Sequence, residues 1–258
     1  MRARVFGEVA DEYDRVRRGF PSALIDDVLA YADVDAMPVL EVGAGTGKAT
    51  VAFAERGVRL TAVEPDEAMA TVLARRLGGD PGVTIEVCAF EDFVLPGPYG
   101  LLLSAQAWHW VNPEVRWRKA AQALAPGGAL ALFWNSDDFA DPAIREASLE
   151  VHRELAPELP PAGLVGVEGL ATMWPGVELR AQPDFGDLVE RLYTGESVMS
   201  TVDFLTYLST QSPYRMLDDD RRAALFAALA GALGSEVRLE IETALYLARK
   251  IPLSGGDS

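Results

Sequence analysis

With 258 residues, about half of them hydrophobic, the chain is long enough for one large α/β domain, and we interpret 1–258 as a single domain. A net charge of −16 repels nucleic-acid phosphates and anionic lipid heads, so we expect a small-molecule partner, no nucleic acid and no membrane. One cysteine excludes an intramolecular disulfide. The lack of a secretory signal or of an apolar run of ~20 residues predicts a cytoplasmic protein. We expect a monomer or a homodimer.

The first half of the chain alternates short apolar runs with helical patterns. The expected strands are 38–42, 59–63, 83–87, a strand beginning at 101–103, and 129–134. The expected helices are 22–31, 48–56, 66–77 and 113–124. This alternation predicts a parallel sheet with helices on both faces and a ligand beyond the carboxyl ends of the strands.

After Trp134 this alternation ends. The expected helices are 141–155, 202–210 and 218–233, and the expected strands are 177–185 and 237–248. Together the patterns predict a Rossmann-like, doubly wound sheet of seven strands, most of them parallel. No HExxH, CxxC or histidine cluster occurs, so the sequence implies no metal site.

A glycine-rich turn follows the first expected strand, with glycines at 43, 45 and 47. Glycine lets a ligand approach bare backbone, and the helix that follows offers free N–H groups. The G-x-G-x-G spacing differs from the dinucleotide fingerprint G-x-G-x-x-G, and Ala49 after Gly47-Lys48 rules out a Walker A loop. Glu64 ends the second strand, where an acid can accept hydrogen bonds from ribose hydroxyls.

These residues resemble the class I S-adenosylmethionine-dependent methyltransferases, especially their type-11 small-molecule branch. The resemblance rests on 40–47 (Leu-Glu-Val-Gly-Ala-Gly-Thr-Gly), on 63–65 (Val-Glu-Pro) with Met69, and on 124–128 (Leu-Ala-Pro-Gly-Gly). It covers roughly 1–135 well. Residues at the N-terminus are similar to the lid segment of that branch: Phe6, Ala10, Tyr13, Asp14, Arg17, Phe20 and Pro21.

The resemblance implies S-adenosylmethionine as cofactor and S-adenosylhomocysteine as product. It implies that Glu41 and the glycine turn hold the methionine part, and that Glu64 binds the ribose. The full set of implied cofactor-binding residues is Tyr13, Arg17, Glu41, Gly43, Ala44, Gly45, Thr46, Gly47, Glu64, Pro65, Met69, Ala89, Phe90, Ala105 and Gln106. The chain departs from the family at Ala89 and Gly100, where relatives often carry Asp.

The candidate catalytic residues are His109 and Tyr13. His109 lies between Trp108 and Trp110 after strand four, and it is a candidate general base, substrate-positioning contact or structural partner. By the resemblance, Tyr13 approaches the methyl group and Arg17 meets the cofactor carboxylate.

We expect methyl transfer to a small-molecule oxygen by in-line displacement. The alternatives are an NAD(P)-dependent oxidoreductase and a non-catalytic S-adenosylmethionine-binding module. On the methyltransferase interpretation, 1–21 is a lid, 22–139 is the cofactor-binding core, 140–220 is a substrate-covering insertion, and 221–258 adds a last helix and strand.

Overall fold

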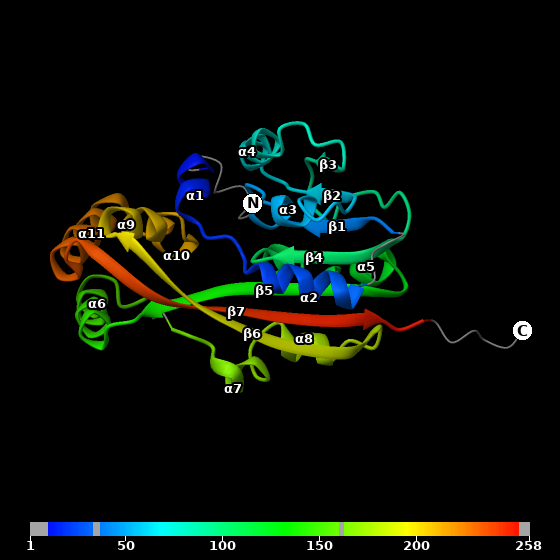
Figure 1. Ribbon diagram of the computed structural model, residues 1–258. Helices are drawn as coiled ribbons and strands as arrows, with labels where there is room; N and C mark the ends of the chain where they lie inside the picture. The colour runs from blue at the N-terminus through cyan, green and yellow to red at the C-terminus, as the bar shows by residue number, and fades with distance from the viewer. Residues whose placement is uncertain (1–9, 33–36, 160–162, 253–258) are drawn as a thin grey trace, which may run out of the picture.

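The computed structural model describes residues 10–32, 37–159 and 163–252, and it is built on one seven-stranded sheet (Figure 1). The strand order is β3-β2-β1-β4-β5-β7-β6, with β7 antiparallel to both of its neighbours. The strands are β1 (Val39–Val42), β2 (Leu60–Val63), β3 (Val83–Glu86), β4 (Tyr99–Ala105), β5 (Leu124–Phe139), β6 (Phe185–Ser200) and β7 (Glu236–Lys250). The predicted Rossmann-like, mostly parallel sheet is confirmed. Phe6 lies outside the described residues.

Helices cover both faces of the sheet and one of its ends. They are α1 (Ala10–Val16), α2 (Ser22–Ala32), α3 (Lys48–Ala54), α4 (Glu67–Leu77), α5 (Arg116–Ala123), α6 (Pro142–Leu155), α7 (Gly166–Leu170), α8 (Gly176–Arg180), α9 (Thr201–Ser209), α10 (Ser212–Arg215) and α11 (Asp219–Leu233). Aspartates cap three of the helices predicted from sequence. The side chain of Asp66 accepts from two backbone N–H groups of α4, and Asp141 and Asp218 do the same for one N–H each of α6 and α11.

Alternate residues of the central strands feed two separate cores, because successive side chains of a strand point to opposite faces. In β4, Leu102 packs with Trp117 of α5, whereas Leu101 and Leu103 pack with the apolar face of α2. All four β1 residues are buried. The apolar run predicted as the first strand is therefore buried on both faces, as is usual in parallel sheets, whereas the edge strand β3 is partly exposed.

The sixth strand differs from the sequence prediction. A strand was expected at 177–185, but the structure has α8 there, and β6 begins only at Phe185. β6 is an edge strand whose charged and partly exposed residues obscure any alternation. Gly176 also favours the observed packing, since a Cβ at this position would lie 2.6 Å from the Tyr246 ring. The range 140–220 therefore supplies a sheet strand as well as covering helices.

Strands β5, β6 and β7 are much longer than the others, and at one end they run into a group of helices (Figure 1). This group, which we call the cap, consists of α6, α9, α10 and α11. Its core contains Phe139 of β5 and Leu239 of β7, together with Phe204 and Leu229 from the cap helices. Helix α1 contacts both α9 of the cap and α4 of the sheet layer. The long strands thus hold the cap beside the carboxyl ends of β1, β2 and β4.

Candidate active site

A cleft of about 1180 Å³ opens at the carboxyl ends of the parallel strands, between the sheet layer, α1 and the start of α10. The structure brings most of the sequence-predicted site residues together on its wall. These are Tyr13, Arg17, Gly43, Gly45, Glu64, Pro65, Met69, Ala89, Ala105, Gln106 and His109. Because they come from segments up to about ninety residues apart, the fold rather than local sequence assembles the cleft.

The three glycines of the turn all have positive φ, but they serve different purposes. A Cβ on Gly43 would lie 2.3 Å from the Cβ of Ala107, and one on Gly47 would lie 2.4 Å from Leu73 Cδ1. A Cβ on Gly45 would meet no described atom within 4 Å. Gly43 and Gly47 therefore permit close packing, whereas Gly45 leaves an open backbone on the cleft wall.

Glu64 joins the end of β2 to the glycine turn. One carboxylate oxygen accepts from the Gly45 N–H at 2.8 Å, and the other accepts from the Asp66 N–H at 2.9 Å. Burial outweighs these two hydrogen bonds and raises the pKa of Glu64 to about 7. A carboxylate and an open backbone segment therefore share one wall of the cleft.

Glu41 lies behind the turn rather than on the cleft wall. It is buried and accepts from Thr50 Oγ1 at 2.7 Å, and burial raises its pKa to about 8. Four more residues expected at the cofactor are likewise buried behind the wall: Ala44, Thr46, Gly47 and Phe90. These residues support the turn and its neighbouring loop from behind the cleft wall.

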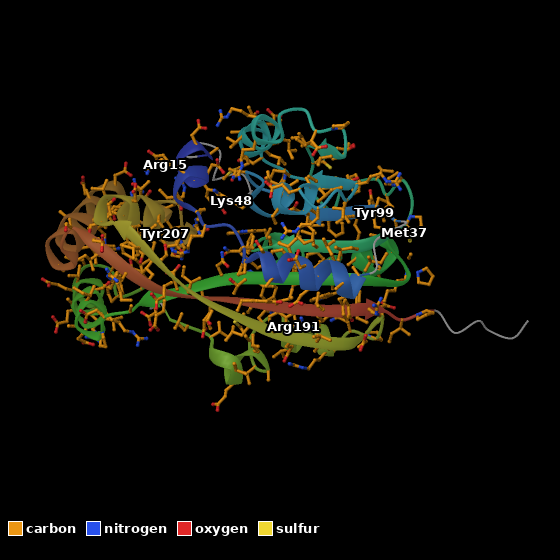
Figure 2. All side chains as sticks on the ribbon, viewed as in Figure 1. Arg15, Met37, Lys48, Tyr99, Arg191 and Tyr207 are labelled. Atoms are coloured by element: carbon orange, nitrogen blue, oxygen red, sulfur yellow. The ribbon has the colours of Figure 1, made fainter. Side chains whose placement is uncertain are left out.

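Helix α1 is held over the glycine turn by contacts to both sides of the cleft. Lys48 Nζ donates to the Asp14 carbonyl at 2.5 Å, and the Asp14 carboxylate pairs with Arg76. On the cap side, Arg15 pairs with Asp203, and Arg17 donates to the Thr210 hydroxyl and carbonyl at 2.9 and 3.0 Å. Figure 2 labels Arg15, Lys48 and Tyr207 on the three elements that meet here, α1, α3 and α9.

The segment after β4 places one tryptophan in the core and the other at the cleft. Trp108 is fully buried, with its ring centroid 5.4 Å from that of Trp117, and it does not line the cleft. Trp110 and His109 line the cleft, and their ring centroids are 4.7 Å apart. Although one side of His109 is exposed, the atoms packed around it and the Arg116 charge lower its pKa. Its imidazole therefore stays neutral at pH 7.

Gln106 has a backbone conformation that non-glycine residues seldom adopt. Its φ is +56°, and its N–H donates to the Phe133 carbonyl of β5 at 2.9 Å. Such strained positions cluster at functional sites because the surrounding structure holds them in place. The strain therefore fits the position of Gln106 on the cleft wall.

Sequence reasoning missed Gln211 and Ser212, which line the cleft from the start of α10. They lie about a hundred residues beyond the last predicted site residue, and the only local signal is a Ser-Pro helix start. Gly100 is explained by packing, since a Cβ there would lie 2.8 Å from Met37 Cβ. The Asp that the family resemblance leads one to expect at this position would therefore require Met37 to move.

Neither a metal centre nor a membrane-spanning helix occurs in the described ranges. Within them, no group of three or more His, Cys, Asp or Glu side chains is placed to hold a metal ion. Over the same part of the chain, no helix combines the length and apolar character needed to cross a membrane.

The glycine turn and the strands beside it fall within a known family. Residues 39–128 match a family model described as a methyltransferase domain. Over these residues the chain is similar to methyltransferases. The resemblance inferred from the glycine turn and Glu64 is thereby confirmed, and this finding favours a methyltransferase over a nicotinamide-dependent oxidoreductase.

Individual relatives agree with this assignment. An uncharacterized methyltransferase from Mycobacterium tuberculosis is 38% identical over 135 residues, which are 52% of this chain and 53% of the relative. The matched stretch thus spans about half the length of that relative. An uncharacterized methyltransferase from Schizosaccharomyces pombe is 24% identical over 98% of this chain and its own full length. A solved structure of a candidate type II methyltransferase from Anaeromyxobacter dehalogenans has a TM-score of 0.63 and 26% identity, covering 92% of this chain and 99% of that one.

Proposed function

We propose that the protein transfers a methyl group from S-adenosylmethionine to an oxygen atom of a small-molecule acceptor and releases S-adenosylhomocysteine. The hydrogen bond from Gly45 to Glu64 carries the proposal, because it joins an open glycine backbone to a carboxylate on one cleft wall. That pair suits an adenosyl amino acid, whose ribose hydroxyls donate to a carboxylate. In this proposal 1–21 acts as the lid, 22–139 holds the cofactor, and the helices of 140–220 cover the acceptor.

The chain's own residues fit the cofactor at several points. Each carboxylate oxygen of Glu64 accepts one backbone hydrogen bond, from Gly45 or from Asp66. A carboxylate oxygen can accept more than one hydrogen bond, so Glu64 can still accept from ribose hydroxyls. Arg17 brings a positive charge to the cleft, although part of its guanidinium already binds Thr210. The aromatic rings of Tyr13 and Trp110 line the cleft, and aromatic faces attract cations such as a sulfonium.

The proposed chemistry needs positioning more than it needs a nucleophilic side chain. When bound, S-adenosylmethionine supplies a methyl carbon activated by the attached sulfonium. The chain aligns the acceptor with that carbon and limits the access of water, which α1 does from above the turn. His109 has an unprotonated imidazole at pH 7, so it can accept the proton of an acceptor hydroxyl. Tyr13 contributes from the lid side of the cleft.

Binding and product formation test the proposal separately. We expect S-adenosylhomocysteine to bind in isothermal titration calorimetry and NADPH not to bind. Incubation of the protein with S-adenosylmethionine and metabolite extracts is expected to yield products heavier by one methylene in mass spectrometry. Tight binding of NADPH without S-adenosylhomocysteine would overturn the proposal. Binding without any methylated product would instead support a non-catalytic module.

Glu64→Gln tests the residue that carries the proposal. The amide can still accept from Gly45 but loses the charge that strengthens hydrogen bonds from ribose hydroxyls, so we expect S-adenosylhomocysteine to bind roughly tenfold more weakly or worse. Glu67→Gln is the matched control, because Glu67 is an exposed acid three residues away. Equal affinities of the two variants in calorimetry would remove Glu64 from the site.

The pH dependence of binding gives a second test of Glu64. The pKa of about 7 means that the carboxyl takes up a proton as the pH falls through neutrality. Ribose hydroxyls donate to the ionised form, so affinity is expected to fall as the pH is lowered from 8 to 6. The Glu64→Gln protein should show a flatter profile over this range.

A further inference from the structure

A second cavity of about 620 Å³ lies between the carboxyl end of β5 and the cap helices α6, α9 and α10. It adjoins the cofactor cleft, since Gln211 lines both spaces. The wall between them also includes the contact of Arg17 with Tyr207, whose ring centroid lies 4.9 Å from the guanidinium carbon. Tyr207 is labelled on α9 in Figure 2. We call this second cavity the cap chamber.

Apolar side chains form a large part of the wall of the cap chamber. It is lined by side chains from β5, β7, α6 and α9, among them Phe139, Leu149, Phe204, Leu208 and Leu239. Its volume lies within the range of pockets that hold small organic molecules, and such pockets combine apolar walls with a few polar groups. The chamber therefore suits a ligand with a mostly hydrocarbon skeleton.

The charged side chains of the chamber are paired within the protein. Asp137 pairs with Arg18, and Asp138 pairs with Arg145. Arg153, the remaining Lys or Arg of the lining, pairs with Glu146. The pair of Asp137 with Arg18 is largely buried, so a charged ligand beside it would have to replace this pair and lose its own hydration, which is costly away from water. The chamber therefore favours a neutral ligand.

The directions of two hydrogen bonds decide what the chamber offers to that ligand. His152 Nδ1 lies 2.7 Å from the Ser148 carbonyl, which can only accept, so the ring proton is on Nδ1. With the ring proton on Nδ1, Nε2 accepts the hydroxyl proton of Tyr214 at 2.9 Å. Tyr207 donates its proton to the Asp137 carboxylate at 2.5 Å. Each tyrosine oxygen therefore presents only lone pairs to a ligand.

Both tyrosines keep their protons under physiological conditions. Burial raises the pKa of Tyr214 to about 12, and burial also raises the pKa of Tyr207. The two phenol oxygens are thus fixed hydrogen-bond acceptors at the polar side of an apolar chamber. A ligand that carries a hydroxyl group can satisfy them, whereas a ligand with only acceptor atoms cannot.

We propose that the cap chamber binds the methyl acceptor, and that this acceptor is a neutral, largely apolar molecule with a hydroxyl group that donates to Tyr214 or Tyr207. The binding specificity stands on the chamber alone, while the role as acceptor site rests on the proposed function. The molecule reaches the cofactor cleft past Gln211. His152 and Asp137 act as positioning residues, because they fix the hydroxyl protons of the two tyrosines.

Three naphthalene probes of similar size test this specificity by titration calorimetry. 2-Naphthol is neutral and donates a hydrogen bond, 2-methoxynaphthalene is neutral without a donor, and 2-naphthoate is an anion. We expect 2-naphthol to bind about 3–10-fold more tightly than 2-methoxynaphthalene, which is the effect of one neutral hydrogen bond. 2-Naphthoate is expected to bind more weakly than either. Equal binding of the two neutral probes, or preference for the anion, would overturn the proposed specificity.

Two variants locate the binding in the chamber. Tyr214→Phe keeps the ring but removes its oxygen, so the preference for 2-naphthol over 2-methoxynaphthalene is expected to shrink towards one. Leu149→Trp places a large side chain on the chamber wall and is expected to weaken all neutral probes at least fivefold, whereas Glu150→Trp on the exposed side of α6 is not. If Leu149→Trp does not change the affinity for the probes, or if S-adenosylhomocysteine displaces them, the probes bind outside the chamber.

The outcomes for the two sites are separable. S-adenosylhomocysteine binding to the wild type and to Leu149→Trp reports the cofactor cleft, and we expect equal affinities. If S-adenosylhomocysteine does not bind to the wild-type protein, the proposed function is refuted. The probe results then still report on the binding specificity of the chamber. If Tyr214→Phe fails to fold, the three probes on the wild-type protein still decide the specificity.

Discussion

At the scale of single residues, His109 connects the structure most directly to chemistry. Packing and the Arg116 charge lower its pKa below the usual histidine value, so the unprotonated form persists to lower pH than for an exposed histidine. A general base must be unprotonated to act. The lowered pKa therefore supports a base at this position, and it does not support a permanently charged contact.

His109→Ala tests that role with an acceptor identified by the product screen. Loss of a general base is expected to lower kcat by roughly 10²–10⁴ while the affinity for S-adenosylhomocysteine stays nearly unchanged. In the wild type, kcat should fall only at pH values below the ordinary histidine range, and this acidic limb should be absent from the variant. If kcat stays within about threefold of the wild type, His109 is a positioning contact and the base role is wrong.

At the scale of elements, the glycine turn packs closely at Gly43 and presents open backbone at Gly45. Gly43→Ala would force a Cβ into the space occupied by the Ala107 side chain, whereas Gly45→Ala faces open space. Both substitutions also carry the cost of a left-handed backbone, roughly 1–2 kcal/mol. We expect Gly43→Ala to lower the melting temperature clearly more than Gly45→Ala in calorimetry. We expect Gly45→Ala, although folded, to bind S-adenosylhomocysteine at least tenfold more weakly.

The opposite pattern would contradict this division of roles. If Gly45→Ala retains wild-type affinity, the open backbone at Gly45 is not part of the site. If the two variants melt at the same temperature, the contact between Gly43 and Ala107 does not limit the packing of the turn.

The helices and strands differ in how well the sequence alone predicted them. The helix starts at Asp66, Asp141 and Asp218 were predictable because capping is a local interaction, and the buried parallel strands were predictable from continuous apolar runs. Strand β6 was not predictable in this way, because its pairing with β7 brings together residues some fifty positions apart. Gln211 was missed for a similar reason, since only the cap brings it to the cleft.

Glu41 shows the same limit for a site residue. Its type and its place before the glycines identified the motif, but the sequence does not tell whether its carboxyl faces the ligand or the core. The structure turns it inward to Thr50. Motif residues therefore reveal the family, and only the folded geometry separates those that contact a ligand from those that support the turn.

At the scale of the whole molecule, α1 joins the sheet layer to the cap. Asp14 binds Lys48 and Arg76 on one side, and Arg17 binds Thr210 on the other. The cofactor cleft and the cap chamber therefore share one boundary, formed by the lid and the start of α10. In the proposed function, closure of the lid over the cofactor and entry of the acceptor through the cap would involve the same contacts.

Stability of the whole fold is expected to depend on pH through Glu41. Its pKa is raised from 4.5 to about 8 in the folded protein, mainly by burial. A raised pKa means that the folded state holds this proton more tightly than the unfolded state, so its contribution to stability is complete below about pH 4.5 and is lost as the pH rises through about 8. The contribution of Glu64 to stability has the same sign, and it is lost as the pH rises through about 7, the pKa of Glu64 in the folded protein.

Glu41→Gln removes the larger of these two contributions. The amide keeps an acceptor for Thr50 but does not ionise, and any cost of burying its extra N–H is the same at every pH. The decrease in melting temperature between pH 5 and pH 8.5 should therefore be smaller in the variant by roughly 5 °C or more, since each pKa unit corresponds to about 1.4 kcal/mol. Glu240→Gln, an exposed acid on β7, serves as the control and should keep the wild-type dependence. Parallel profiles for the wild type and Glu41→Gln would show that Glu41 is not the buried titrating group, whatever the absolute stability of the variant.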